Sequence, residues 1–310
     1  MKRSPPNRPD TASDGMAMVL VLWLLGMIAA LAAVAARVAS AQDAGAALAL
    51  ERVHAQFALT AAIDAAAWQI VSRKVQSGGG MASAKVGGSV ANVSYESEMS
   101  RIDINMASQP LLEGLFSSVG ISPAGAGRLA AAVIDWRDAD DETTPGGAEK
   151  LAYGPGKGPR NGPFADPAEI VDVLGVTPAI AAMVQPLITV ASGSDKIDPG
   201  IAQPGVMLAL PGVTPLKLAG YLDALRLGRP QAEAEALLGD VGSYVAESNS
   251  LAWHLDIDVS TGDGMSSRYQ ASLMVSPSKD APYQVLRLSE AAAPPPPAPS
   301  GPSPGKGARS

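Results

Sequence analysis

The chain carries an uncharged apolar run from Met16 to Ala36. With a rise of about 1.5 Å per residue in an α-helix, this run would span roughly 31 Å, the thickness of a bilayer's hydrocarbon core. The helical pattern continues through residues 44–75, which contain neither proline nor any glycine after Gly45. We therefore expect one helix of about 55–60 residues that spans a membrane with its first half and is amphipathic in its second half, roughly Ala46–Val75.

Three basic residues, Lys2, Arg3 and Arg8, precede the apolar run. Basic residues beside a membrane span stay in the cytoplasm, so this pattern predicts that the rest of the chain is exported. A cleaved secretory signal is the alternative, because Ala39-Ser40-Ala41 resembles a small-x-small cleavage site. The run is long for a signal peptide and the helical pattern continues past that site, so we favour a retained membrane anchor.

The pattern changes after the long helix. The SGGG sequence at 77–80 is a breaker, and residues 85–104 alternate well enough for one or two strands, with Val90, Val93 and Ile102 facing inward. Short helices separated by glycine and proline follow, and they are expected at Pro110–Val119, Pro123–Trp136, Ala165–Leu174, Thr177–Val190, Pro204–Ala209 and Thr214–Leu227.

Strands are expected again in the last part of the chain. They are predicted at Ser243–Asp258 with a break near Ser248–Asn249, at Ser267–Val275 and at Tyr283–Leu288, with the TGDG turn at 261–264. The Pro-rich tail at 291–310 is expected to be disordered. The order predicts an α+β protein in which the long helix packs on an antiparallel sheet. Its parts are a leader at 1–15, a membrane segment at 16–36, the amphipathic helix and first strands at 37–104, an inserted all-helical domain at 105–230, and C-terminal strands at 231–290.

The helical insertion contains a weak internal repeat. Residues 104–136 and 197–226 both read as a polar turn, a short helix, a Gly-(Ile/Val)-(Ser/Thr)-Pro connection and a second helix, and residues 174–184 repeat the connection. Serine or threonine caps each second helix, and proline stands at its first position, where the missing N–H is harmless. The pattern predicts helical hairpins.

The beginning of the chain resembles type IV pilins and pseudopilins, which have a short polar leader ending in glycine and then a long apolar helix. The resemblance implies that a prepilin peptidase cleaves after Gly15 and leaves Met16 as the new, methylated N-terminus. Most members carry glutamate at the fifth mature position, where this chain has Leu20. That glutamate meets the amine of the subunit above it within lipid, where a lone charge is unfavourable. A subunit at the tip of a fibre has no such neighbour, so the departure predicts a tip position.

Four stretches resemble general secretion pathway protein K, the large minor pseudopilin of bacterial type II secretion. They lie at 15–25, 101–112, 133–153 and 161–180. The resemblance implies a pseudopilin fold with an inserted SAM-like, helix-hairpin domain, in a single-pass protein of the bacterial inner membrane with its soluble domain in the periplasm. It also implies a tip complex that starts pseudopilus assembly with two smaller minor pseudopilins, of the I and J types. The further implied partners are the major pseudopilin, the inner-membrane assembly platform, the prepilin peptidase and membrane lipid.

The insertion also contains an acidic segment. Five acids lie within eight residues between Asp135 and Glu142, and Glu149 follows across a glycine-rich loop. Such carboxylates repel one another unless a cation lies among them, and Ca²⁺ accepts six to eight oxygen ligands in flexible geometry. A solvated acidic loop is the alternative. The family resemblance favours a structural calcium site, for which the candidate ligands are Asp135, Asp138, Asp140, Asp141 and Glu149.

Composition limits the other functions. The chain has no cysteine and only two histidines, His54 and His254, which are expected at surfaces or interfaces, while Trp68 and Trp136 are expected in the core. No catalytic motif is present, which argues against a membrane-anchored periplasmic enzyme. A helix-hairpin-helix DNA-binding protein of competence type is the main rival. Residues 103–230, however, hold 14 acidic and 9 basic side chains, so we expect no nucleic-acid partner. A minor pilin of another pilus-like machine is the remaining alternative.

Overall fold

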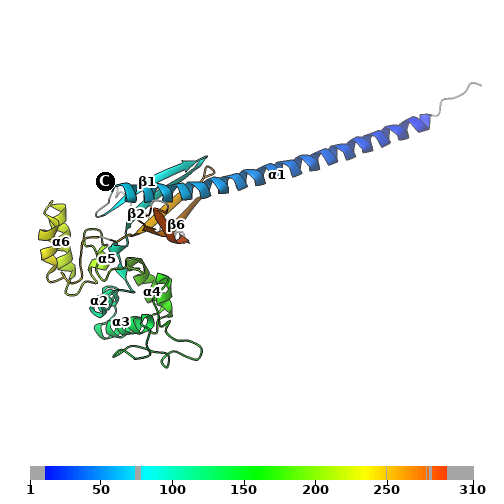
Figure 1. Ribbon diagram of the computed structural model, residues 1–310. Coiled ribbons are helices and arrows are strands. Elements are labelled where there is room, and N and C mark those ends of the chain that lie inside the picture. Colours follow the sequence, from blue (N-terminus) through cyan, green and yellow to red (C-terminus); the bar gives the residue numbers. More distant parts are fainter. Residues whose placement is uncertain (1–10, 74–77, 249, 277, 279–280, 292–310) are drawn as a thin grey trace, which may run out of the picture.

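The computed structural model describes residues 11–73, 78–248, 250–276, 278 and 281–291. A long helix projects from a five-stranded sheet, and a helical domain lies on the opposite side of that sheet (Figure 1). This arrangement of helices and an antiparallel sheet confirms the α+β class. The first ten residues and residues 292–310, which include nearly all of the predicted tail, lie outside the described residues.

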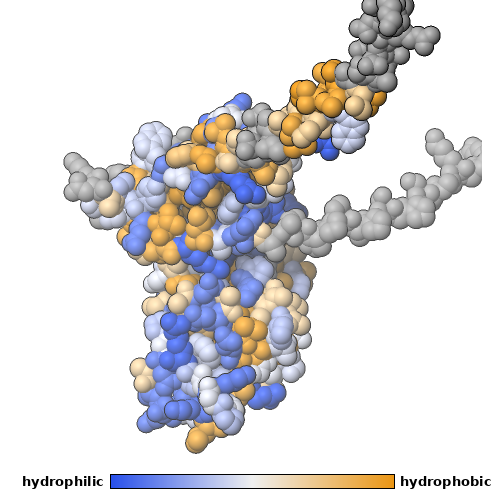
Figure 2. Space-filling model, turned by 90° about the vertical axis from the view of Figure 1, so that its right-hand side faces the viewer, coloured by the Kyte–Doolittle hydropathy of each residue, from blue (hydrophilic) through white to orange (hydrophobic). Residues whose placement is uncertain are grey.

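Helix α1 runs from Thr11 to Arg73 without interruption. It confirms the long helix, although it begins five residues before Met16, because no proline follows Pro9 to interrupt it there. Its segment Met18–Arg37 has a mean hydropathy of 2.6, is long and apolar enough to cross a membrane, and is not buried against other parts of the molecule. Figure 2 shows hydrophobic residues gathered on the projecting part of the helix.

The sheet has the order β1-β2-β5-β6-β7, and every neighbouring pair is antiparallel. Its strands are β1 (Gly79–Val86), β2 (Ser89–Ser97), β5 (Ala252–Ser260), β6 (Ser266–Val275) and β7 (Tyr283–Ala291). The insertion therefore joins β2 to β5, two strands that are hydrogen-bonded neighbours although about 150 residues separate them. The predicted TGDG turn links β5 to β6, where the Thr261 N–H donates to the Met265 carbonyl at 2.9 Å.

The first core lies between α1 and the sheet. Small residues such as Ala58, Ala62 and Ala66 are fully buried on α1, and they let the helix approach the sheet closely. They face alternate residues of the central strands, including Val93 and Leu255, which are also fully buried.

Three expectations about this unit are wrong. Strand β1 begins at Gly79, within the stretch that was expected to be a breaker, because glycine leaves room for the Tyr95 backbone and ring on β2. Val90 does not face the core, since strand side chains alternate and Val93 already faces it. Trp68 is 69% exposed, because the sheet-facing side of α1 is made by Ala62, Ile63, Ala66, Ala67 and Ile70.

The insertion is built from short helices around a second core. Its elements are β3 (Ile102–Asp103), α2 (Gln109–Ser118), α3 (Pro123–Arg137), η2 (Pro167–Asp172), α4 (Pro178–Val184), η3 (Gln185–Leu187), β4 (Ile188–Thr189), α5 (Pro204–Met207), α6 (Pro215–Arg226), α7 (Gln231–Glu235) and η4 (Ala236–Leu238). The expected Ser or Thr caps are present, as Ser122, Thr177 and Thr214 accept hydrogen bonds from N–H groups in the first turns of α3, α4 and α6.

The insertion departs from the expected pattern at several places. The helix expected at 165–174 is the shorter 3₁₀ helix η2, and the one expected at 177–190 ends early, because Pro186 interrupts it and residues 188–189 pair with β3 as a parallel strand. Residues 243–248 belong to no strand of the sheet; Val245 forms a single bridge with Ile197 of the insertion. The inserted core also takes in Leu238 and Val241, so the helical part extends past the expected boundary at residue 230.

Two buried aspartates hold the insertion in place: Asp103 joins its first residues to its middle, and Asp198 joins it to residues before and after it. The Asp103 carboxylate accepts hydrogen bonds from the Gly193 N–H at 2.8 Å and the Ser192 hydroxyl at 3.1 Å, although burial raises its pKa. The Asp198 carboxylate accepts the Ser248 N–H at 2.9 Å, and the Asp198 N–H donates to the Met99 carbonyl at 2.8 Å. These bonds hold the connections into and out of the insertion together.

Gly114 on α2 is expected to tolerate no side chain. An added Cβ would overlap the Ala209 carbonyl, whereas a Cβ at Gly127 on α3 has its nearest neighbour at 3.9 Å. The Gly114→Ala variant should lower the free energy of unfolding by about 1–3 kcal/mol through overpacking. Gly127→Ala, the matched control, should raise it by about 0.5–1 kcal/mol because alanine favours the helix. Urea unfolding followed by circular dichroism checks both; equal midpoints for the two variants would contradict this packing.

Candidate metal centre and assembly surface

The acidic loop begins at the C-terminal end of α3. Asp135 lies in the last turn of this helix and is fully buried, and Asp138 caps its end. Between them, the Arg137 guanidinium turns toward the start of α2, where it donates to the carbonyls of Ile104 and Ala107. The nearest cation in the sequence is therefore bound to backbone carbonyls.

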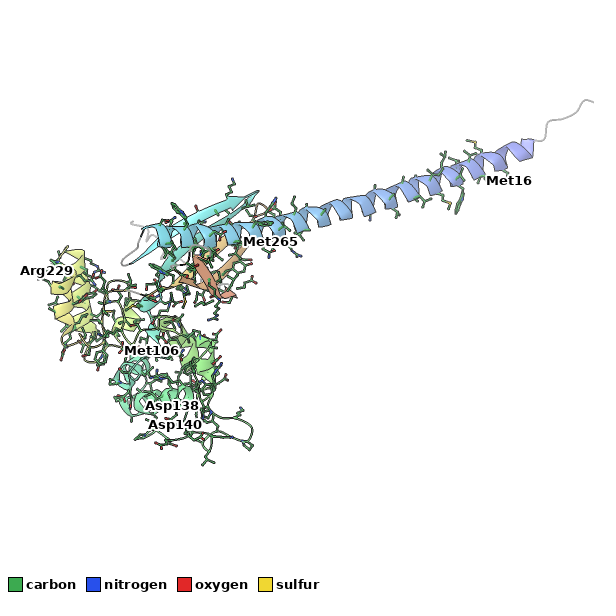
Figure 3. All side chains as sticks on the ribbon, viewed as in Figure 1. Met16, Met106, Asp138, Asp140, Arg229 and Met265 are labelled. Atoms are coloured by element: carbon green, nitrogen blue, oxygen red, sulfur yellow. The ribbon has the colours of Figure 1, made fainter. Side chains whose placement is uncertain are left out.

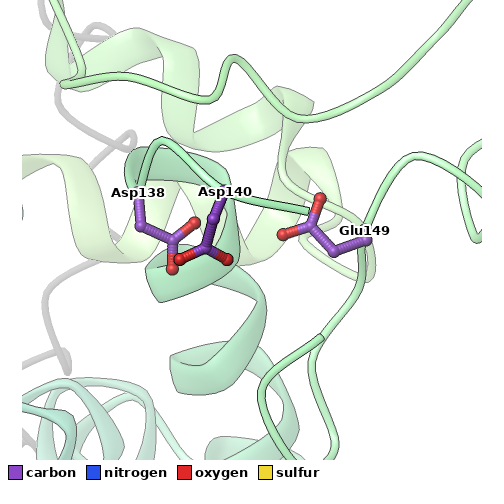
Figure 4. Close-up of side chains that lie close together, drawn as sticks. All are labelled: Asp138, Asp140 and Glu149. Atoms are coloured by element: carbon purple, nitrogen blue, oxygen red, sulfur yellow. The ribbon is translucent and has the colours of Figure 1, made fainter. Parts of the chain in front are cut away.

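Three of the predicted ligands come together in space. One carboxylate oxygen each of Asp138, Asp140 and Glu149 lies within 4.8 Å of the other two. Figure 4 shows Asp138 and Asp140 side by side beyond the helix end, with Glu149 approaching from the returning strand of the loop. Within the described residues this is the group of acidic or histidine side chains with metal-ligand spacing.

Several buried oxygens at this loop have no hydrogen-bond partner. They are Oδ1 of Asp138, both carboxylate oxygens of Glu149, Oδ2 of Asp135 and Oδ1 of Asn161. Leaving a buried polar atom unpaired costs about 1–3 kcal/mol, and more for a charged group. A cation coordinated by these oxygens would remove that penalty, so the donor set fits a bound metal ion.

The raised pKa values of two carboxyl groups in the loop also favour a bound cation. Burial raises the pKa of the Glu149 carboxyl, and repulsion from Asp135 and Asp138 raises it further. Burial also raises the pKa of Asp138, with further repulsion from Asp140 and Asp135. Each ionised carboxylate is unfavourable beside the others in the absence of a counter-charge.

The other two predicted ligands have different positions. Asp135 lies under the cluster, where its Oδ1 accepts the Thr144 N–H at 3.0 Å and its second oxygen stays unpaired. Asp141 instead accepts a hydrogen bond from the Asn161 amide at 3.0 Å. The same amide donates to the Asp140 carbonyl at 3.1 Å, so it fastens the loop from a site 20 residues further along the chain.

Asn161 is a residue that sequence reasoning missed. Its backbone has a φ of 49°, a left-handed conformation that asparagine adopts more readily than most residues. The Asn-Gly pair at 161–162 was a detectable turn signal, but nothing in the local sequence indicates that the turn lies against Asp140.

Three aromatic side chains, Trp136, Tyr153 and Phe164, pack together next to the acidic loop. The Trp136 ring stacks on Phe164 with centroids 5.9 Å apart and contacts Tyr153 at 6.1 Å. The Tyr153 hydroxyl accepts the Leu174 N–H at 3.0 Å. Trp136 is buried as expected, and the cluster anchors residues from both ends of the acidic loop.

The donors in this cluster are the carboxylates of Asp138, Asp140 and Glu149. Hard cations with flexible coordination, Ca²⁺ above all, prefer such ligands, whereas Zn²⁺ favours histidine and cysteine. The chain has no cysteine. The site can therefore hold a structural calcium ion, for which Asp138, Asp140 and Glu149 would be the central ligands.

The predicted processing residues lie at the far end of α1. Gly15 is within the helical backbone, and Met16 and Leu20 are exposed. Figure 3 shows Met16 near the projecting end of the helix. The structure places no other described element beside them, and the cleavage stays a prediction.

The soluble half of α1 has a second apolar side. Large side chains are exposed on the face turned away from the sheet, and we call them the outer stripe: Leu50, Val53, Phe57, Trp68 and Val71. Their spacings of three, four, eleven and three residues keep them on one side of a helix. Exposed apolar side chains on one side of a helix are typical of a contact surface, and here the exposed Asp64 lies between Phe57 and Trp68 on that side.

Comparisons with known proteins find one matching family model and a solved structure with a similar fold. Residues 90–193 match the family model described as "Type II secretion system (T2SS), protein K". No curated protein matches the sequence. A chain in the crystal structure of the GspK–GspI–GspJ complex from the enterotoxigenic Escherichia coli type 2 secretion system has a similar fold, with 17% identity and a TM-score of 0.59. That match covers 81% of this chain and 99% of the other.

Proposed function

We propose that the chain is a minor pseudopilin at the tip of the pseudopilus of type II secretion. The match of residues 90–193 to the family model for protein K supports this proposal, as does the resemblance of the sequence motifs. The chain acts by assembly rather than by catalysis. Together with two smaller minor pseudopilins it starts the fibre that supports protein export across the outer membrane.

The outer stripe of α1 is the observation that carries this proposal. Phe57 is 62% exposed and Trp68 69% exposed, on a helix whose other side is packed on the sheet. Burying two such side chains against partner helices would contribute about 1.5–3 kcal/mol each. The solved complex similar in fold contains GspK with GspI and GspJ, which supports assigning I-type and J-type pseudopilins as the partners here.

The apolar half of α1 supports anchoring in a membrane. Met18–Arg37 is long enough for a single pass, and the preceding basic residues favour a cytoplasmic N-terminus. We assign the anchor to the bacterial inner membrane and the soluble domain to the periplasm. Processing then requires the prepilin peptidase, and assembly requires the inner-membrane platform and the major pseudopilin.

Leu20 supports the position at the tip. A carboxylate at this place within lipid is favourable only if an amine of the next subunit neutralises it. The bulk of the insertion, attached to the end of the sheet farthest from the membrane helix (Figure 1), also leaves little room for a subunit above it.

A structural calcium ion is the second part of the proposal. The unpartnered oxygens of Asp138, Glu149 and Asn161 support it. When bound, the ion would supply positive charge to a loop whose acids repel one another, and it would hold the segments around residues 138–149 and 161 together. Its role would be to keep the inserted domain rigid.

Co-purification tests the assembly role. The tagged full-length chain is produced with the I-type and J-type pseudopilins of the same bacterium and extracted in mild detergent. We expect all three in one complex. A full-length chain that retains neither partner would contradict the proposal.

Processing at Gly15 provides a separate test of the pseudopilin assignment. We expect the intact mass of the membrane-extracted protein to correspond to a chain beginning at Met16 with an N-methyl group. If the peptidase recognises Gly15, as the resemblance to pilins implies, a Gly15→Val variant should keep its leader. A wild-type chain that begins near Gln42 would instead indicate an ordinary secreted protein.

A further inference from the structure

We propose that the cleft between the insertion and the sheet binds a proline-rich segment, and that residues 293–304 of this chain occupy it. The cleft has a volume of about 740 Å³, with β5, β6 and β7 on one side and the insertion around Phe164 and Pro186 on the other. The Arg287–Asp166 ion pair, 3.2 Å long, joins β7 to η2 and holds the two walls together. This inference goes beyond the proposed assembly role and does not depend on it.

Apolar side chains within the cleft are open to solvent. Met274 on β6 is 39% exposed and Leu286 on β7 is 43% exposed, and both line the cleft. Met274 follows Leu273, a residue of the core between α1 and the sheet, so it lies on the opposite face of the sheet. Pro167 and Pro186 line the cleft from the insertion. Proline-rich ligands in a polyproline helix dock in such grooves and would cover these side chains.

The floor of the cleft holds a buried donor that lacks an acceptor. Arg101 is 8% exposed, and its Nη2 donates to the Glu96 carboxylate at 2.7 Å. Its Nη1, however, has no hydrogen-bond partner. The amides of Gln185 and Gln203, both exposed, add further N–H groups at the wall contributed by the insertion.

The acidic side chains of the floor already have partners. The Glu98 carboxylate, on η1 (Glu98–Ser100), accepts the Ser272 hydroxyl at 2.8 Å, and the Asp256 carboxylate accepts the Gln270 amide at 3.0 Å. The cleft therefore offers donors in excess. Proline carries a carbonyl but no N–H, so a proline-rich segment supplies acceptors and few donors that would themselves need partners.

The proline-rich tail of this chain is placed to reach the cleft. Strand β7 contributes Ser289 to the cleft and ends at Ala291, so the tail begins close to the cleft. Residues 294–299 include five prolines. At about 3.1 Å per residue in a polyproline helix they would extend over roughly 19 Å. The cleft runs along β6 from Gln270 to Met274, a distance of about 14 Å at 3.4 Å per residue, so this segment is long enough to fill it.

Tethering and charge favour docking within one molecule. The tail has two basic side chains, Lys306 and Arg309, and no acidic one, whereas residues 1–291 hold 21 basic and 30 acidic side chains. The tail is therefore attracted to the rest of the chain. A tethered segment has an effective concentration on the order of millimolar, and a polyproline helix is ordered before it binds. A weak intrinsic affinity is then enough to fill the cleft.

Thiol labelling tests the cleft. The wild-type chain has no cysteine, so Gln203→Cys and Leu286→Cys place single thiols on its two walls. Leu237→Cys is the control, because Leu237 is 44% exposed on η4, outside the cleft. Each variant is made in the full-length chain and in a chain ending at Ala291, extracted in mild detergent, checked for an unchanged melting temperature and labelled with Ellman's reagent. If one wall variant fails to fold, the other still reports on the cleft.

We expect the thiols at 203 and 286 to react about fivefold more slowly in the full-length chain than in the shortened one. This ratio corresponds to a cleft that is covered in about 80% of the molecules. The thiol at 237 should react equally fast in both chains. A synthetic peptide of residues 293–304, added at about 5 mM to exceed the effective concentration of the tether, should restore protection to the shortened chain. The same peptide with alanine at 294–297 should not.

Equal labelling rates in the full-length and shortened chains would overturn the proposal, and so would full protection by the alanine peptide. Protection of the shortened chain only when the I-type and J-type pseudopilins are produced with it would assign the cleft to another protein, and the tail would not be its occupant. The assembly role has its own test in the co-purification of the three pseudopilins, so failure of one proposal is distinguishable from failure of the other.

Discussion

A Trp68→Glu variant is expected to lose its partners while keeping its fold. Trp68 is 69% exposed and does not belong to the core between α1 and the sheet, so its replacement should leave the melting temperature within about 1 °C of the wild type. In the complex, the indole would be replaced by a carboxylate that has to be desolvated against apolar helices. The loss of burial alone is about 2–3 kcal/mol, so the affinity should fall at least thirtyfold.

Co-purification with the I-type and J-type pseudopilins measures the effect of Trp68→Glu. The matched control is Leu216→Glu, which places the same charge at an exposed apolar position on α6 of the insertion. We expect the control to bind both partners as well as the wild type does. If Trp68→Glu also binds both partners normally, the outer stripe is not an assembly surface.

Calcium is expected to raise the melting temperature of the wild-type protein, and Glu149→Gln is expected to abolish the increase. At a concentration one hundred times the dissociation constant, a ligand that binds only the folded state stabilises it by about 2.7 kcal/mol. For a domain of this size that corresponds to a shift of roughly 5–10 °C. Calorimetry in 1 mM CaCl₂ and in excess EGTA measures the difference.

The Glu149→Gln variant is also expected to have a changed melting temperature in the absence of calcium. Burial and the neighbouring aspartates raise the pKa of Glu149 in the folded state, so its ionised form opposes folding at neutral pH. Glutamine removes that charge, and in EGTA the variant should melt at a higher temperature than the wild type. Glu142→Gln is the matched control, because Glu142 lies in the same loop but outside the cluster, and it should keep the full calcium response. Identical melting of the wild type in calcium and in EGTA would sink the calcium proposal.

Sequence reasoning was most successful where short signals decide the structure. The starts of α3, α4 and α6 were located because serine or threonine followed by proline both caps and begins a helix. It was less successful where partners in space decide. Residues 188–189 were expected to be helical, and they form a strand because Ile102 and Asp103 lie beside them.

At the acidic site, too, the sequence predicted some features and the contacts in space decided the others. The sequence drew attention to the acids at 135–142 and at 149, since their number in one segment is unusual. It could not separate Asp140, which joins the cluster, from Asp141, which turns to Asn161 one residue later. That choice depends on the backbone path of the loop, which the stacked rings of Trp136 and Phe164 help to set.

The sequence by itself determined the long apolar helix, its uninterrupted continuation toward the sheet and the place of the helical insertion in the chain, because length, apolar periodicity and capping act within a few turns of the chain. Only the tertiary structure decided which side of α1 carries the outer stripe and which oxygens meet at the loop. These features depend on contacts between residues far apart in the sequence, and packing of the two cores fixes them. Trp68 illustrates the difference: its hydrophobicity suggested the core, and the alanines beside it occupy the sheet-facing side instead.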